Sequence, residues 1–234
     1  MEHHNDTARP GSSGPQLVSS TADPAPKTEE PLTLFTFGDS ILDCAGYNKY
    51  GLDPGQLLVS NDDHHFPEFK GQDLSSRGPV KLVHLARDGA VVTDLAGQMP
   101  DFIPEGRTVA LVTIGGNDLL RGLAADTGAS GVVLFENTLS AFLSNLRVGK
   151  ILVGTVYDPT CGDDSQNFLS LPVELVRRNH RRVNEVLIRL GEQYGSVVDL
   201  EAHFLRGDRS WFTQIYEPSL LGASEVRNAF LKAI

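Results

Sequence analysis

The chain has 234 residues, 40% of them hydrophobic and 21% charged, which suits one globular domain with an additional segment. Twenty basic residues against thirty acidic ones give a net charge of −10, which argues against nucleic acid or an anionic membrane as a partner. Two cysteines exclude a disulfide scaffold, and no apolar run reaches the roughly 20 residues that span a bilayer. Without the apolar core of a signal peptide, we expect a cytoplasmic protein whose cysteines are free thiols.

Residues 1–31 are rich in Pro, Ser, Thr, Gly and Asp and contain no periodic apolar pattern. Such a segment buries too little surface to offset the conformational entropy that is lost on ordering. We therefore expect a disordered tail at 1–31, followed by one domain over 32–234.

Five short apolar runs then follow, and we predict that each is a β-strand. The runs lie at 32–37, 80–85, 108–114, 150–156 and 196–200. Several are too continuously apolar for a half-exposed strand, so they favour a sheet that is covered on both faces.

Amphipathic stretches alternate with these strands, and we predict helices at 133–146, at 172–194 and at about 219–233. Four arginines of the middle helix are interpreted as a solvated face: Arg177, Arg178, Arg181 and Arg182. The alternation predicts a three-layer α/β/α sandwich with a five-stranded parallel central sheet. Ligands of such folds bind at the carboxyl ends of the strands.

Residues 45–79 depart from the alternation, because Gly, Pro, Asn and Asp occur throughout them. A loop of this length is usually functional or disordered, and its four aromatic side chains need burial. We expect an ordered insertion that covers the carboxyl edge of the sheet and narrows the site.

Three loops at successive strand ends carry candidate chemistry. Gly38-Asp39-Ser40 follows the first strand, and Ser40 is either a helix cap or a nucleophile at a helix N-terminus. Gly89 follows the second strand, and Gly115-Gly116-Asn117-Asp118 follows the third. We predict that the Ser40 hydroxyl, the Gly89 amide and the Asn117 side chain converge on one small cavity.

Together these loops resemble the SGNH (GDSL-type) hydrolase family, and the resemblance spans about residues 32–232. It implies the flavodoxin-like sandwich of that family and esterase chemistry without a metal or an organic cofactor. It also implies that Ser40 is the nucleophile, and that Asn117, Gly89 and the Ser40 amide stabilise the oxyanion.

The family's fourth motif, Asp-x-x-His-Pro ahead of the last helix, is altered. Gln214 stands at the place of the aspartate and Glu217 at that of the histidine, with Pro218 anchoring the alignment. Glu217 can act as a base if burial raises its pKa. Otherwise a displaced histidine serves, for which His64, His65 and His203 are the candidates.

Two further histidines of the domain are interpreted differently: His84 as a core residue within a strand, and His180 as part of the charged helix face. Three aspartates are expected to contact substrate through polar interactions, namely Asp39, Asp118 and Asp158.

Two functions follow from these patterns. The first is a serine esterase that acts on a small ester or an acetylated carbohydrate through a Ser40 acyl-enzyme. The second is a catalytically impaired protein of the same fold that binds a sugar or acyl ligand in the same cleft. The intact Ser40, Gly89 and Asn117 favour the first, and the Gln214 and Glu217 replacements favour the second.

Overall fold

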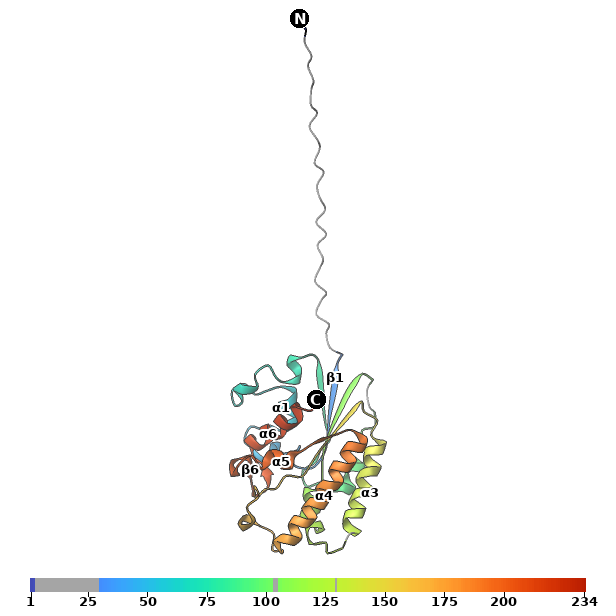
Figure 1. Ribbon diagram of the computed structural model, residues 1–234, viewed down its shortest axis with the longest axis vertical. Helices are drawn as coiled ribbons and strands as arrows, with labels where there is room; N and C mark the ends of the chain where they lie inside the picture. The colour runs from blue at the N-terminus through green and yellow to red at the C-terminus, as the bar shows by residue number, and fades with distance from the viewer. Residues whose placement is uncertain (3–29, 103–104, 129) are drawn as a thin grey trace.

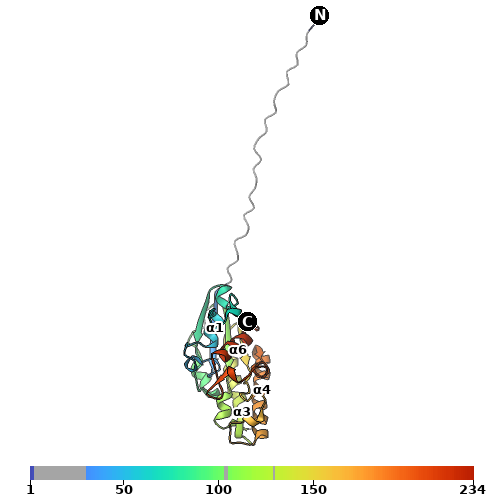
Figure 2. The ribbon, with the colours of Figure 1, turned by 90° about the vertical axis from the view of Figure 1, so that its left-hand side faces the viewer.

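The computed structural model describes residues 1–2, 30–102, 105–128 and 130–234, so the tail expected at 1–31 lies almost wholly outside the described residues. The described chain forms a sheet with helices on both faces, as two perpendicular views show (Figure 1, Figure 2). This arrangement confirms the three-layer α/β/α sandwich.

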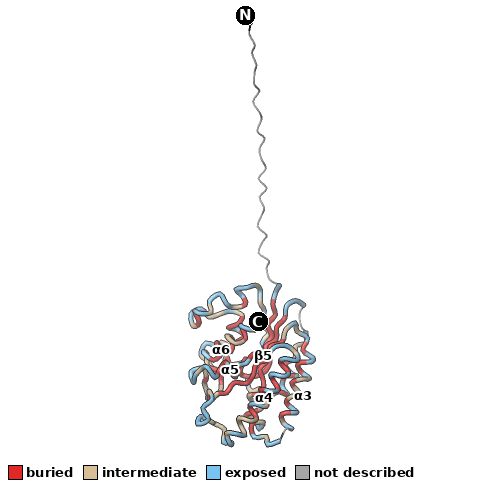
Figure 3. Tube along the Cα trace, viewed as in Figure 1, coloured by how far each residue is buried: buried red, intermediate tan, exposed pale blue. Residues whose placement is uncertain are grey.

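The central sheet has five parallel strands in the order β2-β1-β3-β4-β5. The strands are β1 (Leu32–Gly38), β2 (Val80–His84), β3 (Arg107–Thr113), β4 (Lys150–Gly154) and β5 (Ser196–Val198). β1 pairs with β3 along its whole length, and all seven of its residues are buried. Figure 3 shows that buried residues concentrate along these strands. The five predicted strands are therefore confirmed.

Side chains of each strand alternate between the two helical layers. Phe35 and Phe37 of β1 pack in one core with residues of α3 (Ser130–Asn145) and α4 (Val173–Tyr194). Leu34 packs in the opposite core with residues of α5 (Leu200–Phe204) and α6 (Leu220–Leu231). The two layers thus cover both faces, which explains why the strands are so continuously apolar.

Residues 45–79 are the crossover between β1 and β2 and do not cover the site. Their helix α1 (Pro54–Val59) packs against α6 and β2. All of 45–79 is described, and no residue of it lines the main pocket. The prediction that this segment covers the carboxyl edge is therefore wrong for most of it. Tyr47 does reach that edge, where its hydroxyl donates to Asp88 Oδ2 (2.7 Å).

The aromatic side chains of this crossover anchor it to α6 instead. The guanidinium of Arg227 on α6, which is buried, lies 3.6 Å from the ring centroid of Phe69 and 5.2 Å from that of Phe66. Arg227 also donates a hydrogen bond of 2.9 Å to Asn61 Oδ1. Two of the four aromatic side chains that suggested a cover, Phe66 and Phe69, therefore attach the crossover to α6.

Candidate active site

The turn after β1 sets the position of Ser40. Gly38 has a φ of +115°, and a Cβ there would lie 1.6 Å from the carbonyl oxygen of Thr113, so only glycine fits. The buried side chain of Gln98 holds Gly38 on both sides, accepting from its amide (2.6 Å) and donating to its carbonyl (2.9 Å). Gln98 is not predictable from the sequence, because it lies 60 residues from Gly38 and no motif around it indicates the contact.

No helix begins at Ser40, contrary to expectation. Residues 40–42 form a turn in which the amides of Leu42 and Asp43 both donate to the carbonyl of Asp39 (3.1 Å each). Ser40 is therefore not the cap of a helix that follows it. Its side chain lines the main pocket.

Asn117 lies in the short helix α2 (Gly116–Leu120), directly after β3. Its amide nitrogen donates to the carbonyl of Ala90 (3.1 Å), and an amide carries a second hydrogen that can serve a ligand. Asn117 lines the same pocket as Ser40.

The loop that carries Gly89 is tied to α2 at two further points. Both carboxylate oxygens of Asp118 accept from the amide of Val92 (3.1 Å), and Arg121 donates to the carbonyl of Gly89 (2.8 Å). Gly89 lines a separate surface groove, and Asp118 does not line the main pocket. Asp118 therefore positions this loop, and the substrate contact expected of it does not fit its location.

Glu217 reaches the pocket from a small hairpin. β6 (Phe212–Thr213) pairs antiparallel with β7 (Glu217–Pro218). The turn between them holds Gln214 and Ile215 at φ values of +45° and +80°, a region that L-residues rarely adopt. Gln214, at the place of the family's aspartate, is exposed, whereas Glu217 is only 5% exposed.

The Glu217 carboxylate lies beside the Ser40 hydroxyl. Burial raises the pKa of Glu217, a hydrogen bond with the Ser40 side chain acts to lower it, and the charge of Asp88 raises it. Among the described residues Glu217 Oε2 has no hydrogen-bond partner. A carboxylate with a raised pKa in the same pocket as a hydroxyl is a candidate general base.

Asp39, the neighbour of Ser40, joins β1 to β3. Its Oδ1 accepts from Thr113 Oγ1 (3.0 Å) and from the amide of Ile41 (3.2 Å), while Oδ2 is buried without a partner among the described residues. Burial raises the pKa of Asp39 to about 7, and the charges of Asp118 and Glu217 add to the rise. A second carboxyl group that is partly protonated at neutral pH therefore lies close to the candidate base.

None of the three displaced histidines lines the main pocket. His65 pairs with Asp62 (2.9 Å), His203 pairs with Glu225 (2.8 Å), and His64 is exposed on the crossover. These positions do not support them as the base.

His84 and His180 also differ from expectation. His84 is not a core residue: it is exposed on the edge strand β2, where it hydrogen-bonds with Thr36 Oγ1 (2.9 Å). His180 is buried and lines the pocket, with Nε2 3.0 Å from the carbonyl oxygen of Val156 and Nδ1 3.5 Å from Glu201 Oε1. Both of its nitrogens therefore face protein groups.

The arginines of α4 are not simply a solvated face. Arg181 is exposed, but Arg177 is half-buried, lines the pocket and forms an ion pair with Asp158. Burial acts to raise the pKa of Asp158, but hydrogen bonds from Arg177 and Thr160 hold it below its usual value. Asp158 lines the pocket as expected, yet its carboxylate is already bound within the protein.

A match to a known family agrees with this fold and these loops. Residues 36–220 match the GDSL-like lipase/acylhydrolase family. The chain therefore belongs to this family of ester hydrolases, and its resemblance to SGNH hydrolases is confirmed.

Solved structures give the same fold. An acetylxylan esterase from Geobacillus stearothermophilus, Axe2, superposes with a TM-score of 0.61 at 21% identity, over 88% of this chain and 94% of that one. An alpha/beta hydrolase from the metagenome of Lake Arreo, Spain, superposes with a TM-score of 0.55 at 21% identity, over 88% and 95%. No curated protein matches the sequence significantly. Within the described ranges, no helix is long and apolar enough to cross a membrane.

Proposed function

We propose that this chain is a serine esterase in which Ser40 is the nucleophile and Glu217 is the general base. The observation that carries the proposal is that Ser40 and the buried Glu217 line the same pocket, where the Ser40 side chain acts on the raised pKa of Glu217. Asn117 lines the same pocket and offers a free amide hydrogen.

In the proposed reaction Glu217 accepts the Ser40 proton while Ser40 Oγ forms a bond to the ester carbonyl carbon. Asn117 and the amide of Ser40 donate hydrogen bonds to the resulting oxyanion, whereas Gly89, predicted as a third donor, lines the separate groove. When the tetrahedral intermediate collapses, the bond to the alcohol oxygen breaks and Glu217 returns the proton to it. Water then attacks the acyl carbon while Glu217 accepts a proton from it. The bond to Ser40 Oγ breaks, Glu217 returns the proton to Ser40, and the acid is released.

The absence of histidine from this position sets an expectation for the rate. An unperturbed Glu, with a pKa of about 4.3, is a weak base toward an alcohol. Burial raises the pKa of Glu217 and so reduces this mismatch. We expect turnover that depends on Ser40 and is slow compared with histidine-based esterases.

Hydrolysis of p-nitrophenyl butyrate tests the two roles. We expect Ser40→Ala to abolish turnover and Glu217→Gln to lower kcat by about 10²- to 10⁴-fold, as removal of a general base does. The matched controls are Ser144→Ala and Glu174→Gln, two exposed residues of α3 and α4 that do not line the pocket. Both controls should retain full turnover.

The second candidate function is that of a catalytically impaired protein that binds a sugar or acyl ligand. The exposed Gln214 at the place of the family's aspartate favours it. If wild type and Ser40→Ala turn over equally slowly across several esters, this reading replaces the esterase. If Ser40 is essential while Glu217→Gln is neutral, Ser40 remains the nucleophile and another group must accept its proton.

A further inference from the structure

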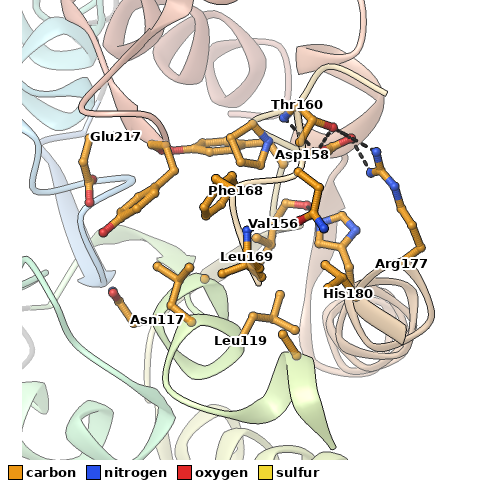
Figure 4. A pocket seen from close by; sticks show the side chains of 18 of the residues that line it. Asn117, Leu119, Val156, Asp158, Thr160, Phe168, Leu169, Arg177, His180 and Glu217 are labelled. Carbon is orange, nitrogen blue, oxygen red and sulfur yellow. Dashed lines mark hydrogen bonds and ion pairs between the residues drawn. The ribbon is translucent and has the colours of Figure 1, made fainter. Parts of the chain in front are cut away.

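The main pocket extends well beyond the catalytic pair, and its middle is apolar. It encloses about 860 Å³, including space that is open to solvent. Six of the apolar residues that line the pocket are Leu119, Leu120, Ala124, Phe168, Leu169 and Val176. Figure 4 shows Glu217 and Asn117 at one end, Asp158 with Arg177 at the other, and Phe168 with Leu169 between them.

The polar groups at the far end are already paired with one another. Asp158 accepts hydrogen bonds from Thr160 Oγ1 (2.7 Å), from the amide of Gly162 (2.9 Å) and from Arg177. Arg177 also donates to Asp164 Oδ1 (2.8 Å). A sugar in this pocket would need partners for its hydroxyl groups, and these side chains are committed elsewhere.

Two further polar side chains of the lining also have partners within the protein. Asn167, which lines the pocket, donates to the carbonyl of Leu171 (3.1 Å) and accepts from the amide of Leu169 (3.2 Å). His180 faces Val156 and Glu201 through its two nitrogens. The interior therefore favours an apolar occupant, because burial of apolar surface needs no polar partner.

We propose that the acyl group of the substrate is a medium-length alkyl chain that lies along this apolar lining. The chain runs from Ser40 toward the Arg177–Asp158 pair, which closes the far end and limits its length. This inference rests on the proposed esterase function. The orientation follows from the chemistry: the carbonyl oxygen faces Asn117 and the leaving oxygen faces Glu217, so the acyl chain takes the remaining direction.

An acetyl group, the acyl group that the name of the Geobacillus enzyme specifies, would leave most of this pocket unfilled. Each methylene of a longer chain would instead be removed from water. We therefore expect selectivity for chain length, set by the pocket walls and by the ion pair at its end.

Turnover of p-nitrophenyl esters from acetate to octanoate, each kept below its micelle concentration, tests the proposal. For wild type we expect kcat/KM to rise by about fourfold per added methylene, which corresponds to ~0.8 kcal/mol per buried CH₂, until the chain meets the Arg177–Asp158 pair. Val176→Phe, which fills the pocket from the half-buried face of α4, should lower the octanoate-to-acetate ratio at least about tenfold. Leu175→Phe, also half-buried on α4 but outside the lining, should leave the ratio unchanged.

Binding separates this inference from the esterase function. Octanamide and acetamide are uncharged, so Glu217 and Asp39 do not repel them, and calorimetry with Ser40→Ala measures their affinity without turnover. We expect octanamide to bind at least about a hundredfold more tightly.

Tighter binding of octanamide supports the acyl pocket, even in a protein that turns over no ester and so fails the proposed function. An octanamide Kd no lower than that of acetamide overturns the inference, whatever Val176→Phe does to folding. Turnover that depends on Ser40 would in that case leave the esterase function standing.

Discussion

At the scale of single residues, the site combines a serine with two buried carboxyl groups. Asp39 and Glu217 are 1% and 5% exposed, and each has one oxygen without a partner among the described residues. Burial of a carboxyl group disfavours its charged form, so the pKa values of both are raised. Catalysis and stability should therefore respond to pH in opposite directions.

The pH dependence of turnover tests the role of Glu217. A general base works only when it is deprotonated, so kcat/KM for p-nitrophenyl butyrate should rise with pH through the raised pKa of Glu217. In Glu217→Gln the residual rate should lose this rise. A wild-type profile that stays flat between pH 5 and pH 8 would contradict a carboxylate base.

The stability of the protein tests the burial of Asp39. Its pKa is about 7 in the fold, against 3.8 as the ordinary value, so the native state holds the proton more tightly than the unfolded chain does. The free energy of unfolding should therefore fall as pH rises between these values, by up to about 1.4 kcal/mol per pH unit.

In urea titrations, Asp39→Asn should gain stability relative to wild type at pH 8 and show little of this gain at pH 4. Asp63→Asn, at an exposed site, is the control and should show no such trend. Equal pH slopes for Asp39→Asn and wild type would mean that Asp39 is not buried as a neutral acid.

At the scale of elements, the β6–β7 hairpin presents Glu217 through a strained turn. Ile215 is 50% exposed and has a φ of +80°, so it pays a steric cost for its conformation without burying its side chain. The hairpin tolerates this cost because β7 continues into α6, whose Ser219 cap accepts from the amide of Gly222 (3.1 Å).

Relief of this strain should stabilise the protein. We expect Ile215→Gly to raise the free energy of unfolding by roughly 1 kcal/mol, because glycine adopts a positive φ without the Cβ clash. Ile215→Val retains the branched Cβ and should give no gain. Thermal unfolding of the three proteins measures the difference, and a loss of stability in Ile215→Gly would show that the turn is not strained.

At the scale of the whole molecule, the two layers have separate tasks. Residues of α2, α4, the loops after the strands and the β6–β7 hairpin line the pocket, whereas the crossover at 45–79 packs against α6 on the other face. Arg227 holds this second layer together through Phe66, Phe69 and Asn61. Changes at Arg227 should therefore affect stability without affecting the chemistry.

We expect Arg227→Ala to lower the free energy of unfolding by roughly 2–4 kcal/mol, because it removes desolvated cation–π contacts and leaves buried partners unpaired. The kcat of the folded fraction, measured at low temperature, should equal that of wild type. Arg227→Lys should recover little stability, since a lysine cannot stack a planar group on the rings. A large loss of kcat at full folding would restore the idea that the crossover covers the site.

The sequence by itself determined the strands, the long helices and the loops that carry Ser40, Gly89 and Asn117. These features depend on local patterns: apolar runs specify strands covered on both faces, and glycine at Gly38 and Gly115 permits the positive φ that the turns require. Local signals of this kind are written in neighbouring residues, so they can be interpreted before the fold is known.

Only the tertiary structure decided which distant groups meet. It brings Glu217 to Ser40, holds Gly38 with Gln98, and places the crossover against Arg227 rather than over the site. It also pairs His65 and His203 with carboxylates away from the pocket. Burial and pairing depend on the packing of segments far apart in the chain, and they decide which carboxyl group can act as a base.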